Sequence, residues 1–182
     1  MQVRRVVTAV RPDGISAFSS DTLRAPLTFR ALPGLEFYPV WATRSGHPVI
    51  DTLDDVPAGT PYWPEPGETR FLLVRWTPEN FEQPLNDEPD APDVDEALPG
   101  LMGAFEVDNP GFHTSASVDY GVCLEGEMVL ELDEGQEVIL HPGDCVVQRG
   151  TRHVWRNRTD RPALMMYVLV GAESDSKPNV QE

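Results

Sequence analysis

The sequence has few basic residues, with 14 Lys and Arg against 30 Asp and Glu in 182 residues, and Lys177 is the single lysine. The formal net charge is −16. Because nucleic acids and anionic membrane surfaces attract basic faces, this balance argues against both as main partners. The excess of arginine over lysine indicates a composition bias rather than a site.

The sequence also lacks a long hydrophobic run. No segment reaches the roughly 18 consecutive apolar residues of a membrane-spanning helix. The first ten residues carry Arg4 and Arg5 but neither the apolar core nor the cleavage site of a secretion signal, so a cytoplasmic protein is the default expectation. An apolar content of 40% excludes disorder throughout, and the length suits one large domain or one domain with long arms.

Cysteine is scarce, and the common catalytic motifs are absent. Cys123 and Cys145 each lie in an apolar run, and we interpret both as buried free thiols, with a disulfide or a thiolate ligand pair as the alternative. The sequence contains no Cys-x-x-Cys, no Gly-x-Gly-x-x-Gly, no Gly-x-Ser-x-Gly and no His-Glu-x-x-His. These absences leave no familiar nucleophile, dinucleotide loop or zinc protease helix.

Proline is concentrated in the first part of the chain, where 15 of the 18 prolines precede Gly111. Because proline disrupts helix interiors, residues 1–100 are expected to form an N-terminal extension of short strands and loops that packs on the rest. Strand patterns cover residues 4–10, 27–30, 36–43 and 70–77. Residues 78–99 hold five prolines and eight acids without Lys or Arg, which indicates a solvated loop or a lid, with one helical turn at 93–98.

Residues 101–172 are expected to form the compact core, followed by a flexible tail at 173–182. Short strand patterns recur at regular intervals and are separated by turns that contain Gly, Pro or Asp. Such a pattern predicts an all-β antiparallel barrel or sandwich. The expected strands cover residues 118–124, 127–132, 137–140, 144–148, 152–157 and 164–170.

Three residues of this region could form a polar site. His113 opens the region, His153 follows Gly150, and Asp119 lies between them. A straight strand would separate positions 113 and 119 by about 20 Å, so a shared ion requires a bend, which the small polar residues 114–117 would allow. Asp119 could instead satisfy backbone donors or pair with Arg152 or Arg156, and His153 could form only a hydrogen bond inside the barrel. The remaining histidines, His47 and His141, are expected in loops.

Two motifs in residues 111–170 resemble those of the cupin superfamily. The first motif ends in a glycine and normally has two histidines and a glutamate, and here its positions are His113, Ser115, Asp119 and Gly126. The second motif ends in Gly-x-x-His-x-x-x-Asn, at Gly150, His153 and Asn157. Ser115 replaces a histidine and Asp119 replaces the glutamate. The phrases DYGVCLEGE and PGDCVVQRGTRHVWRN are similar to small stand-alone bacterial and fungal cupins.

The resemblance implies a jelly-roll β-barrel and a divalent metal ion held by His113, Asp119 and His153, which would also be the catalytic residues. This set resembles the facial triad of non-haem iron enzymes, although Zn, Mn or Ni would also suit it. The expected substrate-binding residues share the barrel interior or its rim, and they are Ser115, Tyr120, Trp155 and Tyr167. Cupins often pair through N-terminal strands, which implies a homodimer.

The function implied by the resemblance is that of a metal-dependent enzyme acting on a small organic metabolite. Its Lewis-acid chemistry would be decarboxylation, dehydration or cyclisation of a polyketide-like or keto acid. The alternatives are an Fe(II)-dependent dioxygenase and a non-catalytic cupin that binds a small molecule.

Overall fold

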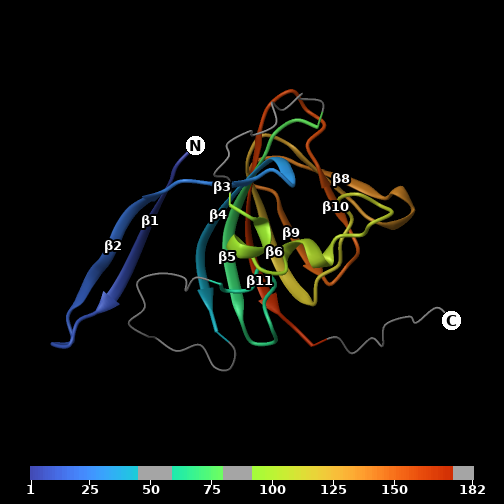
Figure 1. Cartoon of the computed structure of the whole chain (residues 1–182). Helices are drawn as coiled ribbons and strands as arrows, with labels where there is room; N and C mark the ends of the chain where they lie inside the picture. The colour runs from blue at the N-terminus through green and yellow to red at the C-terminus, as the bar shows by residue number, and fades with distance from the viewer. Residues whose placement is uncertain (45–58, 80–91, 174–182) are drawn as a thin grey trace.

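The computed structural model describes residues 1–44, 59–79 and 92–173 of the chain. These residues are mostly strand, arranged in three antiparallel sheets, with only short helical turns between them (Figure 1). The prediction of an all-β antiparallel protein is confirmed.

The largest sheet has the strand order β3–β4–β5–β11–β6–β9. Because β5 pairs with β4 on one side and with β11 on the other, the proline-rich half is hydrogen-bonded into the barrel wall. The sequence analysis expected the strands of residues 1–100 to pack on the barrel without naming them as part of its wall. The division of the chain into an extension and a core at residue 100 stays a prediction. The strands are β3 (Leu27–Phe29), β4 (Leu32–Thr43), β5 (Thr69–Trp76), β6 (Ser117–Glu125), β9 (Cys145–Arg149) and β11 (Ala163–Gly171).

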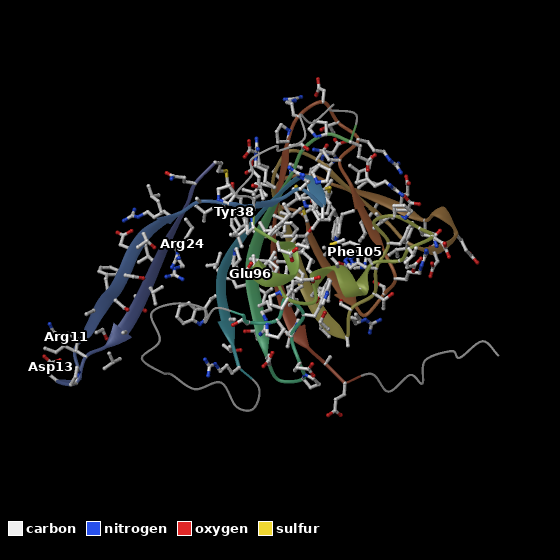
Figure 2. The ribbon with its side chains drawn as sticks, viewed as in Figure 1. Arg11, Asp13, Arg24, Tyr38, Glu96 and Phe105 are labelled. Carbon is white, nitrogen blue, oxygen red and sulfur yellow. The ribbon has the colours of Figure 1, made fainter. Side chains whose placement is uncertain are left out.

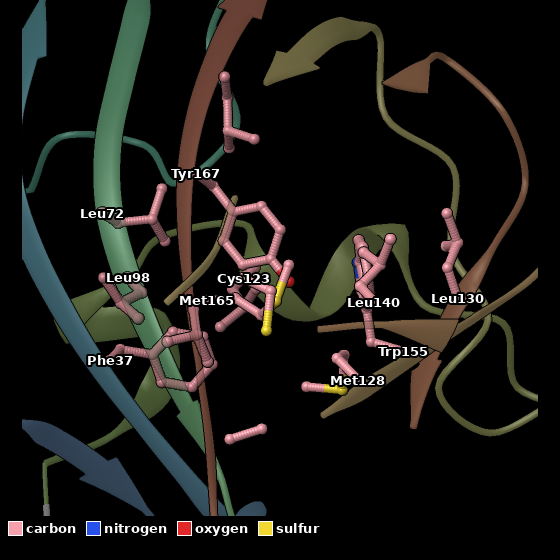
Figure 3. Close-up of a cluster of buried hydrophobic side chains, with 14 of the residues drawn as sticks. Phe37, Leu72, Leu98, Cys123, Met128, Leu130, Leu140, Trp155, Met165 and Tyr167 are labelled. Atoms are coloured by element: carbon pink, nitrogen blue, oxygen red, sulfur yellow. The ribbon is translucent and has the colours of Figure 1, made fainter. Parts of the chain in front are cut away.

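A smaller sheet, in the order β10–β7–β8, faces the large one and completes the barrel. Its strands are β10 (Val154–Arg156), β7 (Met128–Glu131) and β8 (Glu137–Leu140). Met165 and Tyr167 of the large sheet share one buried core with Met128 and Trp155 of the small one (Figure 3). Each large apolar side chain buried there contributes about 1.5–3 kcal/mol, so the barrel interior is the main source of stability.

The third sheet is a hairpin of β1 (Val3–Val10) and β2 (Ser16–Arg24) that extends away from the barrel (Figure 1). At its tip, which Figure 2 labels, Arg11 forms an ion pair of 3.0 Å with Asp13. Within the described residues, neither strand of the hairpin pairs with a third strand.

A short helical segment lies beside the large sheet at the position where the sequence predicts one helical turn. Helix α1 (Val94–Ala97) begins after Asp93, whose carboxylate accepts the backbone N–H of Asp95 at 2.8 Å. The 3₁₀ turn η1 (Leu101–Ala104) follows it, and a second 3₁₀ turn, η2 (Asp133–Gly135), joins β7 to β8. Leu98 and Leu101 pack into the barrel core, so this segment helps to close the barrel.

Two expectations differ from the structure. The sequence analysis missed β2, because this strand contains three Ser and one Asp and lacks the apolar alternation of a half-buried strand. Both cysteines are free, as expected, but Cys145 is exposed because it starts β9 on the outer face, whereas Cys123 is buried. His47, residues 80–91 of the acidic segment and most of the tail lie outside the described residues.

Among the described residues, no helix has both the length and the apolar character needed to cross a bilayer.

Candidate functional site

The backbones of His113 and His153 form an isolated antiparallel bridge. The N–H of each residue donates to the carbonyl of the other at 3.0 Å. Residues paired in this way place their side chains on the same side of the two chains. The imidazole rings are therefore neighbours, with centroids 4.2 Å apart.

A straight strand would place His113 and Asp119 about 20 Å apart, and this bridge explains how both can line one cavity. Strand β6 begins only at Ser117, and the chain turns between His113 and that residue. The N–H of Gly150, a residue with a φ of 61°, donates to the carbonyl of Ser117 at 3.0 Å. His113 and Asp119 thus reach one cavity from two separate stretches of backbone rather than from one strand.

Each imidazole is anchored in the same way. Nδ1 of His113 lies 3.1 Å from the carbonyl of Gly111, and Nδ1 of His153 lies 2.8 Å from the carbonyl of Thr151. A carbonyl only accepts hydrogen bonds, so Nδ1 of each neutral ring carries the proton. The lone pair then resides on Nε2 of both rings, which is the tautomer that a metal ligand requires.

Burial keeps both rings neutral. His113 is 8% exposed and His153 is 2% exposed. Burial lowers the pKa of His113, and burial together with the neighbouring His113 lowers the pKa of His153 to about 4. Near pH 7 both imidazoles are uncharged and can donate an electron pair.

Asp119, on β6, is a buried carboxylate with one oxygen free. Its Oδ2 accepts a long hydrogen bond of 3.4 Å from Ser115 Oγ, which in turn accepts one of 2.8 Å from Ser117 Oγ. Its Oδ1 has no hydrogen-bond partner among the described residues. Burial raises the pKa of Asp119, and the hydroxyls of Ser117 and Ser115 act against that shift.

These side chains line one cavity of about 50 Å³ inside the barrel, whose other walls are mainly aromatic and aliphatic. The space admits an ion or a few water-sized groups. Within the described residues, two buried polar atoms at this cavity, Asp119 Oδ1 and Gln148 Nε2, have no hydrogen-bond partner. Since buried polar groups are rarely left unpaired, this cavity is the candidate binding site.

Most of the residues expected at the site meet there. His113, Asp119, His153, Trp155 and Tyr167 all line the cavity. Trp155 and Tyr167 form an edge-on ring pair with centroids 5.6 Å apart.

Two of the expected substrate-binding residues lie elsewhere. Ser115 is buried beside Asp119 but does not line the cavity. Tyr120 is 50% exposed and pairs with Val147 of β9 on the outer face of the large sheet. Tyr120 does not line the cavity, because side chains alternate along β6 and Asp119 occupies the inner side, and its assignment as a substrate-binding residue stays a prediction.

The two arginines near the site form ion pairs with glutamate side chains. Arg152 binds Glu106 with its Nε at 2.5 Å and stacks on Phe112, with its guanidinium carbon 3.9 Å from the ring centroid. Arg156 binds Glu131 at 2.6 Å. Neither is paired with Asp119, and Arg152 instead holds the segment that precedes His113.

Asn157, the last residue of the second motif, has a structural role. It is 1% exposed, and its Nδ2 donates to the carbonyls of Trp76 and Arg161 at 3.1 and 2.7 Å. Its Oδ1 accepts from Thr159 Oγ1 at 2.7 Å. Asn157 thus connects the turn between β10 and β11 to the end of β5.

His141, which the sequence predicts in a loop, has an exposed side chain 3.5 Å from Glu127.

Sequence analysis missed several residues of the cavity. Gln148 was detectable in principle, because a glutamine inside the apolar strand Cys145–Arg149 at the inward position breaks the pattern of that strand. Tyr62 and Trp63 gave no signal, since they lie among prolines in a segment without periodicity. The rings of Trp63 and Phe105 lie 5.6 and 4.9 Å from that of His113 and shield it from solvent.

The donor chemistry at the cavity fits a divalent metal ion. Two neutral imidazoles and a carboxylate oxygen without a partner are typical ligands for such an ion. Among the described residues, no three His, Cys, Asp or Glu side chains stand close enough together to hold an ion in their present positions. The imidazole pair is already assembled, and a shared ion would require Asp119 to move toward it.

A family model described as a cupin domain matches residues 105–170. The chain is 57% identical over 68 residues to phomopsin biosynthesis cluster protein C′ of Diaporthe leptostromiformis, covering 35% of this chain and 36% of that protein. It is 45% identical over 67 residues to the cupin-domain-containing oxidoreductase fogC of Aspergillus ruber, covering 35% and 32%. The matches thus span about a third of the length of these relatives.

Among solved structures, the cupin domain of an XRE family transcriptional regulator from Enterobacter cloacae superposes with a TM-score of 0.40. The identity is 12%, and the superposition covers 77% of this chain and 99% of that one.

Proposed function

The chain belongs to the cupin superfamily and has its jelly-roll fold, and on that premise we propose that it is a metal-dependent enzyme acting on a small organic metabolite. His113, His153 and Asp119 would hold the ion and form the catalytic centre. Fe, Zn, Mn and Ni would all accept this ligand set. A divalent ion bound there acts as a Lewis acid that polarises a carbonyl or carboxylate oxygen of the substrate.

The protein's own residues prepare the site for this chemistry. The carbonyls of Gly111 and Thr151 hold both imidazoles with Nε2 available, so the two rings would bind an ion without a change of tautomer, whereas Asp119 would have to move toward them. Asp119 supplies negative charge and an oxygen without a partner.

Aromatic side chains complete the cavity wall. Trp63, Phe105 and Trp155 exclude bulk water, which strengthens every electrostatic interaction inside. Tyr167 also lines the cavity, and its hydroxyl would bind an oxygen of the metabolite. Such a site suits decarboxylation, dehydration or cyclisation of a polyketide-like or keto acid, in which negative charge develops on an oxygen.

The assembled imidazole pair is the observation that carries this proposal, and metal analysis tests it. We expect purified protein, or protein reconstituted with Fe²⁺, Zn²⁺, Mn²⁺ or Ni²⁺, to bind one ion per chain. His153→Ala and His113→Ala should each weaken that binding at least tenfold. His141→Ala, at an exposed turn histidine, is the matched control and should bind normally. Wild-type protein that takes up none of these ions would leave the non-catalytic cupin as the better description.

Several relatives favour a second candidate, an Fe(II)-dependent dioxygenase. Proteins of Aspergillus ruber and Hypocrea virens, 45% and 44% identical over the matched segment, are named cupin-domain-containing oxidoreductases. The same three ligands would serve such an enzyme. Oxygen consumption by the iron-loaded protein with candidate metabolites separates the two, because Lewis-acid chemistry consumes no O₂.

We further propose that two copies pair through the β1–β2 hairpin in the cytoplasm. A lone two-stranded hairpin is marginally stable in water, and this one exposes Phe18 at 78%, Leu23 at 62% and Val10 at 59%. Residues 1–24 carry four Arg against two Asp, whereas the whole chain has a net charge of −16. An apolar arm with a basic balance therefore complements the acidic body of a second copy.

A further inference from the structure

A second cavity, of about 280 Å³, adjoins the cavity at the histidines. Its walls come from β3, β4, β5, helix α1 and residues 59–62. The buried apolar side chains Phe37, Leu72 and Leu98 contribute to them. We call this the outer cavity and the space at the histidines the inner cavity.

The two cavities share a wall. Phe37 and Tyr62 are the residues that line both. Their rings meet edge-on, with centroids 6.1 Å apart. From Tyr62 the ring contacts continue to Trp63, 4.8 Å away, and from Trp63 to His113, 5.6 Å away. A row of ring contacts thus connects the lining of the outer cavity with the imidazole pair.

Two arginines, Arg24 and Arg70, line the outer cavity, and the contacts of Arg70 show that its charge is not free to bind a ligand. Arg70 is 7% exposed, and its guanidinium donates to the carbonyls of Pro61 at 2.7 Å and Thr43 at 3.2 Å and binds Glu68 at 2.5 Å. The arginine is engaged in holding the segment that carries Tyr62. The space left for a ligand is therefore mainly apolar and aromatic.

At the inner end, Gln148 supplies a hydrogen-bond donor that nothing in the described chain uses. It is 4% exposed, is the cross-strand partner of Asp119, and its Nε2 has no hydrogen-bond partner among the described residues. An amide N–H calls for an oxygen acceptor on the ligand. The Oδ1 of Asp119 lies at the same cavity, so in the metal-free protein a neutral carbonyl oxygen is favoured over an anionic one.

We propose that the two cavities form one binding site for an aromatic compound with a neutral carbonyl group, with the ring system in the outer cavity and the carbonyl oxygen accepting from Gln148. This inference rests on the proposed function, because it names the substrate class for the same site. Edge-on contacts with Phe37 and Tyr62 favour an aromatic body over an aliphatic chain. The carbonyl end would lie next to the imidazoles.

Equilibrium dialysis of metal-free protein tests the carbonyl recognition. The probes are 2-acetonaphthone, which has the acceptor, and 2-ethylnaphthalene, which has the same ring system without it. We expect wild-type protein to bind the ketone at least tenfold more tightly, and Gln148→Leu to remove that preference. Gln136→Leu, at an exposed glutamine, should keep it. A preference that survives in Gln148→Leu, or none in the wild type, would overturn the assignment.

Filling the outer cavity tests where the rings lie. Ala42→Phe and Ala97→Phe place a ring into the outer cavity from two different elements, so one remains informative if the other fails to fold. Each folded variant should bind both naphthalene probes at least tenfold more weakly, and Glu96→Phe, on the exposed side of α1, should not. Unchanged binding in the filled variants, or equal binding of decanal and 2-acetonaphthone to the wild type, contradicts the inference. Metal uptake by the same proteins is measured separately, so failure of the proposed metal centre is distinguishable.

Discussion

His113 and His153 are joined by two backbone hydrogen bonds of 3.0 Å, and their rings lie 4.2 Å apart although 40 positions separate them in the sequence. The bridge is isolated from the named strands, so its residues are not held there by a long ladder. The pairing fixes both backbones, and the Nδ1 contacts fix both rings. The backbone therefore sets the positions of two of the three expected ligands.

The buried histidines should make stability depend on pH. The pKa of His153 is lowered to about 4, below its usual value near 6.5, so the unfolded chain binds a proton that the folded protein does not. The contribution of neutral His153 to the free energy of unfolding is thus complete above about pH 6.5, and it is lost as the pH falls toward 4. The loss amounts to about 3 kcal/mol at the lower end.

Urea unfolding of metal-free wild type and His153→Gln between pH 7 and 4.5 checks this. The variant should lose clearly less stability than the wild type over that range. Asp119, whose raised pKa acts in the opposite direction, is retained in both proteins, so the difference isolates the histidine. His141→Gln should behave like the wild type. Equal losses in His153→Gln and wild type would show that His153 is not held neutral.

Gly126, the last position of the first motif, should not tolerate a side chain. Its φ is +76°, and a Cβ there would lie 2.6 Å from the carbonyl oxygen of Pro162. Gly135 also has a positive φ, of +68°, but a Cβ there meets nothing within 4 Å. Gly135→Ala should cost about 1–2 kcal/mol for the backbone alone, and Gly126→Ala should cost clearly more because of the clash.

Chemical denaturation of both alanine variants measures the difference. A similar loss in the two proteins would mean that the turn at Gly126 relaxes away from Pro162.

How far the sequence predicts this fold depends on the element. β11 is a continuous apolar run and β6 is rich in strand-forming residues, and both strands lie within two residues of their expected bounds. Helix α1 was predictable because Asp93 is a good N-cap in front of a short helix-forming stretch. Strand β2 was not, because its stability depends on pairing with β1 rather than on its own composition.

Only the site residues that stand at positions of the two sequence motifs could be predicted. His113, Asp119 and His153 are polar residues at expected spacings, and all three line the cavity. The cross-strand pairing of Gln148 with Asp119 depends on register between β6 and β9, which composition does not encode. Tyr62 reaches the cavity from a distant proline-rich segment, so only the tertiary fold brings it there.

Pairing of two copies through the β1–β2 hairpin predicts that a change in the hairpin weakens the dimer. Phe18→Ser removes the most exposed aromatic ring of the hairpin and should shift the protein from dimer to monomer. Val107→Ser changes an equally exposed apolar residue, 94% exposed, outside the hairpin, and should leave assembly unchanged. Sedimentation velocity across a concentration series checks both. A monomeric wild type, or a dimer that Phe18→Ser does not weaken, contradicts pairing through the arm.

The most direct test of the metal centre is a crystal structure of the Mn²⁺-reconstituted protein with an anomalous map collected to locate the ion. The account predicts one peak per chain, bonded to Nε2 of His113, Nε2 of His153 and an Asp119 oxygen, with the carboxylate rotated toward the rings. A map without a peak between the two imidazoles, or a peak elsewhere in the barrel, would contradict it.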